Sequence, residues 1–177
     1  MSYDPYAALP AVPALAVTSA SFEDGARLPL AQVGGMLGTG GGDCSPHLAW
    51  SAVPQGTRSI AVTCFDPDAP TASGFWHWAV WGIPADTVEL PEGAVVLDTL
   101  GAGLPTGASV LRNDAGFAGF VGAAPPPGHG DHRYMFVVHA LDIDDLALDA
   151  AASPALLGFH MFGHTLARGR ITGTFGH

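Results

Sequence analysis

The chain has 177 residues and a mass of 18.0 kDa, and its 16 acidic residues outnumber 6 arginines to give a net charge of −10. So few cations exclude nucleic acid as a partner, because they cannot displace the counterions of a phosphate backbone. No stretch approaches the roughly 20 apolar residues that a membrane span needs, so we expect no integral membrane contact.

The length suits one domain, residues 1–177, with a single core. The N-terminus lacks the basic and apolar regions of a signal peptide, and Cys44 and Cys64 are too few for a disulfide scaffold, so we expect a cytoplasmic protein. Hydrophobic residues make up 48% of the chain and charged residues only 12%. This composition predicts a homodimer that covers an apolar surface, although a bias toward Ala, Gly and Arg would explain it equally well.

Short strands are expected at residues 14–18 and 48–50, separated by a glycine-rich loop. Residues 59–65 form a clear strand with alternating apolar positions. Period two places the even-numbered residues of this strand on one face, with Asp66 next in the same row.

Residues 76–83 and 133–141 are continuous apolar runs rich in aromatic and β-branched residues. Such runs are typical of central strands that are covered on both faces. The region between them, residues 84–130, is irregular, with weaker strand signals at 95–97 and 117–121. Period two predicts two rows that each share a face: His77, Ala79 and Trp81 in the first strand, and His132, Tyr134 and Phe136 in the second.

A helix is predicted from residue 153 to residue 168. Ser153 suits the N-cap and Pro154 the first helical position, and the arginines at 168 and 170 lie where the helix dipole favours cations. A last strand is expected at 171–175. Many strands followed by one helix predict a mostly β fold, an antiparallel β-sandwich of Greek-key type with a C-terminal α-helix.

Two short segments carry most of the ionisable chemistry. Residues 66–70, Asp-Pro-Asp-Ala-Pro, lead towards His77, and residues 125–134 run from three prolines through His132. Asp66 falls at the end of one expected strand, and the two histidines fall at the starts of two others, so their side chains can meet. A carboxylate beside an imidazole stabilises the imidazolium, so we expect a pocket that carries both signs of charge.

Such a pocket suits a phosphate-like, carboxylate-like or zwitterionic headgroup. Imidazolium and the backbone N–H groups of the turn at 128–130 would hold the anion. Asp66 and Asp68 would accept hydrogen bonds from an ammonium or hydroxyl group. The leading interpretation is therefore a small-molecule or anion-binding protein, with no cofactor and no metal.

Both segments also have ordinary turn chemistry, which is the alternative explanation for their composition. Aspartate before proline and histidine between glycines are common in turns. Because the chain must reverse within residues 66–70, we expect a cis peptide bond between Ala69 and Pro70.

Two further interpretations use the same residues. An enzyme could use His77 or His132, with Asp66 or Asp68, for general acid–base proton transfer on a small substrate. His77, His129, His132 and Asp66 could instead supply a tetrahedral zinc set. A third alternative is an interaction module whose pocket has lost its role. No Gly-x-Ser-x-Gly elbow supports a serine hydrolase.

Five segments occur in an order and at spacings that resemble those of a known family. They are residues 45–50 (Ser-Pro-His-Leu-Ala-Trp), 66–70, 74–78 (Gly-Phe-Trp-His-Trp), 125–134 and the helical segment that ends in Gly163-His164. Together they are similar to the phosphatidylethanolamine-binding protein family, in its bacterial YbhB/YbcL or Raf kinase inhibitor-like branch. The resemblance implies an antiparallel β-sandwich with a small anion pocket at one end.

The resemblance also implies which residues line that pocket. Asp43 stands where the bacterial pattern commonly has Asn, and Ala124 stands where some members have Gly. The segment 70–76 is short for the aromatic loop ligand of animal members. The implied lining residues are Asp66, Asp68, His77, Ala124, Pro125, Pro126, His132 and Tyr134.

Overall fold

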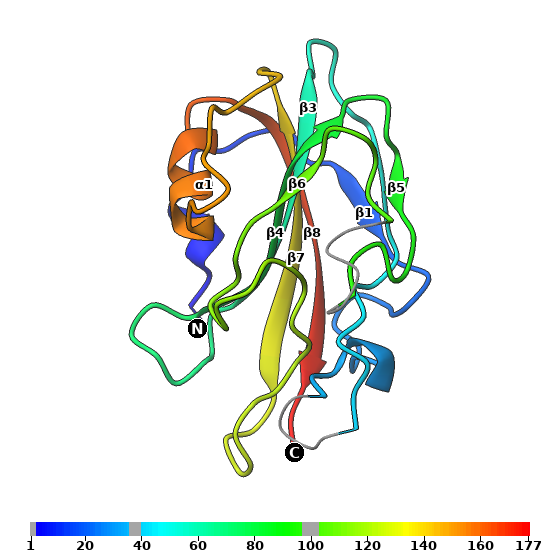
Figure 1. The fold of residues 1–177 in the computed structure, drawn as a ribbon, viewed down its shortest axis with the longest axis vertical. Helices are drawn as coiled ribbons and strands as arrows, with labels where there is room; N and C mark the ends of the chain where they lie inside the picture. Colours follow the sequence, from blue (N-terminus) through cyan, green and yellow to red (C-terminus); the bar gives the residue numbers. More distant parts are fainter. Residues whose placement is uncertain (1–2, 36–39, 97–102) are drawn as a thin grey trace.

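The structure is a computed structural model that describes residues 3–35, 40–96 and 103–177. Its elements are drawn in Figure 1. In chain order they are the 3-10 helix η1 (Pro5–Ala8), β1 (Ala16–Thr18), the 3-10 helix η2 (Leu30–Gln32), β2 (Leu48–Ser51), β3 (Ser59–Asp66), β4 (Phe75–Pro84), β5 (Glu89–Leu90), β6 (Ser109–Val110), β7 (His132–Leu141), α1 (Pro154–Met161) and β8 (Thr165–Phe175).

The strands form two sheets in which all paired strands are antiparallel. The larger sheet has the order β6-β4-β3-β7-β8, and the smaller one has the order β1-β2-β5. The smaller sheet covers one face of the larger sheet, and α1 covers the other face (Figure 1). The predicted mostly β sandwich with a C-terminal helix is confirmed.

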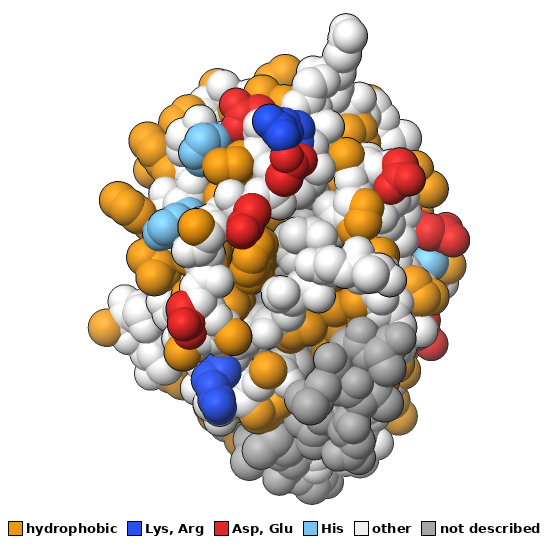
Figure 2. Space-filling model, turned by 45° about the horizontal axis from the view of Figure 1, so that its top comes forward, with side chains coloured by type: hydrophobic (Ala, Val, Ile, Leu, Met, Phe, Trp, Pro, Cys, Tyr) orange, Lys and Arg blue, Asp and Glu red, His pale blue; other side chains and the backbone are white. Residues whose placement is uncertain are grey.

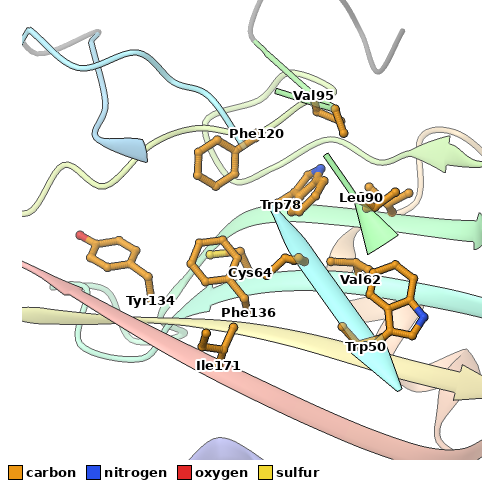
Figure 3. Close-up of a cluster of buried hydrophobic side chains, with 14 of the residues drawn as sticks. Trp50, Val62, Cys64, Trp78, Leu90, Val95, Phe120, Tyr134, Phe136 and Ile171 are labelled. Atoms are coloured by element: carbon orange, nitrogen blue, oxygen red, sulfur yellow. The ribbon is translucent and has the colours of Figure 1, made fainter. Parts of the chain in front are cut away.

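The main hydrophobic core lies between the two sheets, and its composition follows from the alternation of side chains along the central strands. Every residue of β3 is buried. Val62 and Cys64 face the smaller sheet and pack with Trp78 and Phe136 (Figure 3). Ala61, which precedes Val62 and therefore points to the opposite side of the strand, faces the helix instead. Both faces of β3 are therefore apolar because each face lies against another layer.

The C-terminal helix is shorter than predicted. It begins after the Ser153 N-cap, whose side chain accepts a hydrogen bond from the Leu156 N–H, but it ends at Met161. The chain then turns and enters β8 at Thr165, so Arg168 and Arg170 are strand residues. From here on buried and less buried positions alternate along β8, and pairing with the full length of β7 outweighs the helix propensity of this segment.

The two weaker strand predictions were wrong. Residues 117–121 form no strand, and Val96 forms an isolated bridge with Cys44 rather than part of a strand, while Leu97 lies outside the described residues. The segment 117–121 is apolar because it covers the core, where Phe120 is buried. The backbone of this segment forms hydrogen bonds with other elements. The Val121 N–H, for example, donates to the His77 carbonyl.

No helix within the described residues is long and apolar enough to cross a membrane.

Candidate functional site

A cavity of about 370 Å³ lies at the end of the sandwich where β3 ends and β7 begins. This is also the end at which β8 finishes and the C-terminus lies (Figure 1). We call it the strand-end cavity. Seven of the predicted site residues line it: Asp66, His77, Ala124, Pro125, Pro126, His132 and Tyr134.

Asp66 and two histidines form a chain of hydrogen bonds beside this cavity. The Asp66 Oδ2 atom lies 2.8 Å from His132 Nδ1, and both side chains are buried. His132 Nε2 lies 2.9 Å from His129 Nδ1, and His129 is exposed. Because a carboxylate accepts, His132 must donate from Nδ1, and its Nε2 is engaged by His129. These hydrogen bonds connect the buried Asp66 carboxylate to the surface of the protein.

The zinc set considered from the sequence does not assemble around one point. His77 is outside the hydrogen-bonded chain, and both ring nitrogens of His132 are already engaged. Within the described residues no group of three or more His, Cys, Asp or Glu side chains is arranged to hold a metal ion.

A β-bulge aims His77 into the cavity. Cys64 pairs with Trp78 and Phe65 pairs with Trp76, so His77 is an extra residue in β4 without a partner on β3. The bulge puts His77 against Tyr134, with ring centroids 5.0 Å apart, on the side of the main core. The predicted row of His77, Ala79 and Trp81 was therefore wrong at His77, because Ala79 and Trp81 pack on the side of the sheet that faces α1. Bulges re-aim side chains in this way beside functional sites.

His77 is held as a neutral imidazole with one nitrogen free. Its Nδ1 lies 2.8 Å from the Val121 carbonyl and must donate to it. Burial lowers the pKa of His77 below 6.5, and this outweighs the opposing effects of the Val121 hydrogen bond and the Asp66 charge. Nε2 has no hydrogen-bond partner among the described residues, so at neutral pH it presents a lone pair to the cavity.

Tyr134 brings an unpaired hydroxyl to the same place. Its side chain is 1% exposed, and its hydroxyl makes no hydrogen bond of ordinary geometry among the described residues. Figure 3 shows the ring at one end of the core, with the hydroxyl pointing away from the other labelled side chains. Burial raises the pKa of Tyr134 far above its usual value, opposed only in part by the nearby Ala124 backbone. The hydroxyl is therefore a protonated donor.

Asp68 does not line the cavity and instead fastens the turn that follows β3. Its carboxylate accepts two hydrogen bonds from the Arg133 guanidinium, at 2.7 and 2.8 Å, and one from the Arg133 backbone N–H at 3.0 Å. The Arg133 hydrogen bond lowers the pKa of Asp68. This pair ties the turn to the start of β7, so Asp68 has a positioning role.

Two expectations for the loops were wrong. The peptide bond between Ala69 and Pro70 is trans, because the described chain has no cis peptide bond. The chain reverses through hydrogen bonds from Asp68 N–H to Asp66 Oδ1 and from Thr71 N–H to the Ala69 carbonyl. The turn at 128–130, expected to bind the anion, is exposed and does not line the cavity.

Asp43, noted in the sequence only where Asn is common, supports the cavity wall from behind. One carboxylate oxygen accepts from the Gly35 N–H and the other from the Gly122 N–H, both at 2.8 Å. Asn would offer only one acceptor for these two donors. Gly122 lines the cavity, and a Cβ there would lie 2.3 Å from the Val33 carbonyl carbon, so only glycine fits. In the sequence, Gly35 and Gly122 were the signal that could have indicated this role of Asp43.

The cavity is suited to binding and to proton exchange. It combines one buried carboxylate, Asp66, a neutral acceptor on His77 and a hydroxyl donor on Tyr134. The described residues that line it include no serine or cysteine that could act as a nucleophile.

Comparison with known proteins agrees with the motifs. A family model described as phosphatidylethanolamine-binding protein matches residues 18–176. The UPF0098 protein YbhB of Escherichia coli K12 is 49% identical over 160 residues, which cover 89% of this chain and 97% of that protein. The UPF0098 protein YbcL of the same strain is 46% identical over 159 residues, or 90% of this chain and 86% of that protein.

Solved structures show the same fold. The crystal structure of E. coli YbcL, described as a new member of the mammalian PEBP family, matches with a TM-score of 0.88 and 44% identity, covering 92% of this chain and 98% of that one. The putative homologue CT736 of Chlamydia trachomatis matches with a TM-score of 0.76 and 28% identity, covering 93% and 98%. The chain belongs to the phosphatidylethanolamine-binding protein family.

Proposed function

We propose that the strand-end cavity binds a small anionic or zwitterionic group, such as a phosphate, a carboxylate or a zwitterionic headgroup. The observation that carries the proposal is Tyr134, which lines the cavity beside His77 and whose buried hydroxyl makes no hydrogen bond of ordinary geometry among the described residues. An unpaired buried donor costs free energy, which a ligand oxygen would recover.

The charges of the cavity favour a ligand that brings a proton or a cation. Asp66 is a buried carboxylate, and burial keeps His77 neutral, so a bare dianion would meet no full positive charge there. A monoprotonated phosphate can donate to His77 Nε2 and accept from Tyr134. A zwitterion adds an ammonium group for Asp66. The family description names phosphatidylethanolamine, whose headgroup joins a phosphate to an ammonium.

Replacing Tyr134 with phenylalanine is expected to weaken the binding of O-phosphoethanolamine and inorganic phosphate about tenfold or more. A hydrogen bond to a charged oxygen contributes roughly 1.5–3 kcal/mol, and the variant keeps the ring that packs on His77. Isothermal titration calorimetry at pH 6.5 measures the change.

Tyr6→Phe is the matched control, because Tyr6 also carries a buried hydroxyl without a hydrogen bond of ordinary geometry among the described residues but does not line this cavity. Its affinity for the two phosphate probes should equal that of the wild type. Equal losses in both variants, or no binding by the wild type, would refute the proposed site.

The alternative of proton-transfer catalysis would rest on His77. Its Nε2 is free and its pKa is lowered by burial, as a general base at neutral pH requires, whereas both nitrogens of His132 are engaged. Turnover of p-nitrophenyl phosphate by the wild type and its loss in His77→Gln would favour this alternative over binding alone.

The homodimer stays a prediction, and so does the cytoplasmic location. Leu156, Phe159 and Phe162 on and beside α1 are 43%, 76% and 61% exposed. Hydrophobic side chains gather at the edge of the molecule where α1 lies (Figures 1 and 2). We expect sedimentation velocity to give a dimer mass that is reduced by Phe159→Glu. A monomer mass at all concentrations would contradict the expectation.

A further inference from the structure

A second cavity, of about 210 Å³, lies on the opposite face of the five-stranded sheet. Its walls come from α1, from η1 and from the helix-facing side of the sheet; Figure 1 shows both helices on this side of the sheet. We call it the helix-side cavity. Most of its lining is apolar, including Leu9, Phe65, Trp76 and Met161.

Four polar groups in this cavity are buried without hydrogen-bond partners among the described residues. His139 is 4% exposed, and neither of its ring nitrogens is paired. The Tyr6 and Thr63 hydroxyls lie near each other, but neither makes a hydrogen bond of ordinary geometry. The Arg168 Nε is the fourth. Even where the two hydroxyls pair with each other, His139 and the Arg168 Nε still lack a partner, and native structures pair nearly all such groups.

Arg168 is also without a counter-charge. Arg27, Arg58, Arg133 and Arg170 each form an ion pair with an aspartate. Within the described residues Arg168 has no such pair, and its Cζ lies 5.9 Å from the centroid of the Tyr6 ring. Burial lowers the pKa of Arg168. Arg168 is half-buried, but its Nε is fully buried, and a buried charged donor without an acceptor is costly.

We propose that the helix-side cavity is a second binding site, for a small carboxylate with an apolar tail. The carboxylate would accept from Arg168 Nε and from the Tyr6 hydroxyl, and the tail would lie against Phe65, Trp76 and Met161. A guanidinium suits a carboxylate because its donors are arranged as a fork.

The rest of the cavity fits this class of ligand. Its volume is below the roughly 300 Å³ at which pockets for drug-sized ligands begin, which favours a medium-chain rather than a long-chain acid. Burial lowers the pKa of His139 to about 3, so His139 is neutral and offers a hydrogen bond without a second charge. Among the described residues that line the cavity there is no carboxylate side chain to compete for Arg168.

Titration of the protein with octanoate tests the proposal, with octan-1-ol as a neutral probe of the same chain length. Octanoate should bind more tightly than the alcohol, and Arg168→Gln should weaken octanoate about tenfold to a hundredfold while changing the affinity for the alcohol little. Arg58→Gln removes the same charge from an exposed ion pair with Asp144 and should leave octanoate binding unchanged. Equal losses in both variants would overturn the proposal.

Reciprocal variants separate this site from the strand-end cavity. Tyr6→Phe should weaken octanoate and leave phosphate unchanged, whereas Tyr134→Phe should do the reverse. Octanoate should still bind in the presence of saturating phosphate. Loss of octanoate binding in Tyr134→Phe but not in Tyr6→Phe would assign octanoate to the other cavity and contradict the proposal.

His139→Phe distinguishes a binding role from a structural one. Neither ring nitrogen has a hydrogen-bond partner among the described residues, so the variant should raise the midpoint of thermal unfolding of the unliganded protein by about 2–4 °C, while octanoate binds more weakly. A lower midpoint together with unchanged octanoate affinity would show that His139 serves only the packing of the sheet, against the proposal.

Discussion

Replacing Asp66 with alanine is expected to lower the free energy of unfolding by about 3–5 kcal/mol. Asp66 is 3% exposed and accepts hydrogen bonds from His132 Nδ1 and from the Asp68 N–H, both at 2.8 Å. Alanine leaves both donors without a partner, and His132 is itself buried at 2% exposure. Urea denaturation followed by tryptophan fluorescence measures the loss.

The chain offers a matched control for this effect. Asp142 Oδ1 lies 2.8 Å from His164 Nδ1, the same distance as in the buried pair, but these side chains are 44% and 42% exposed. Exposed ion pairs contribute about 0–1 kcal/mol, so Asp142→Ala should cost no more than that. If the free energy of unfolding falls equally in the two variants, burial of Asp66 and His132 is not the cause of the loss.

The affinity for sulfate is expected to fall about tenfold for each pH unit above the pKa of His77. Sulfate brings no proton in this pH range, so the protein must supply the positive charge, and only the fraction with protonated His77 binds it. Burial lowers the pKa of His77 below 6.5, so this fraction is small at neutral pH and grows as the pH falls. Calorimetric titration between pH 5 and 8 gives the slope.

The stability of the unliganded protein should depend on pH in the opposite sense. Because the pKa of His77 is lower in the folded protein than in the unfolded chain, the unfolded chain takes up the proton first. The stabilisation is complete above 6.5 and is lost as the pH falls towards the folded pKa. His139, with a pKa of about 3, acts in the same direction.

His77→Gln should abolish the slope of sulfate affinity, whereas Tyr134→Phe should weaken binding and keep the slope. Sulfate affinity that rises with pH would contradict the assignment of His77. A slope that survives in His77→Gln would show that another group takes up the proton and would also contradict this assignment.

The long strands could be predicted from the sequence because period and composition agree there. The strands expected at 59–65 and 133–141 are observed as β3 (Ser59–Asp66) and β7 (His132–Leu141). The two central strands keep their regular alternation, so the shared face of His132, Tyr134 and Phe136 was also correct. Periodicity could not assign the residues around Pro126 to the pocket, and only the family resemblance indicated them.

The direction of His77 could not be predicted, because a bulge depends on the register between two strands. Period two assumes that every residue has a partner, and His77 has none on β3. The role of Asp68 was missed for a related reason. Its partner Arg133 lies 65 residues further along the chain, and only the pairing of β3 with β7 brings them together.

The end of the helix could not be predicted because local and long-range preferences conflict there. Residues 162–168 continue a sequence that suits a helix, yet from Thr165 onwards they pair with β7. The pairing satisfies the backbone of β7, which would otherwise be left open along its length.

A crystal structure of the protein grown with O-phosphoethanolamine at pH 6 tests the central claim most directly. We expect the phosphate within hydrogen-bond distance of both the Tyr134 hydroxyl and His77 Nε2, with the ammonium group on the side of Asp66. A strand-end cavity filled only by water, or a ligand that contacts neither Tyr134 nor His77, would contradict it.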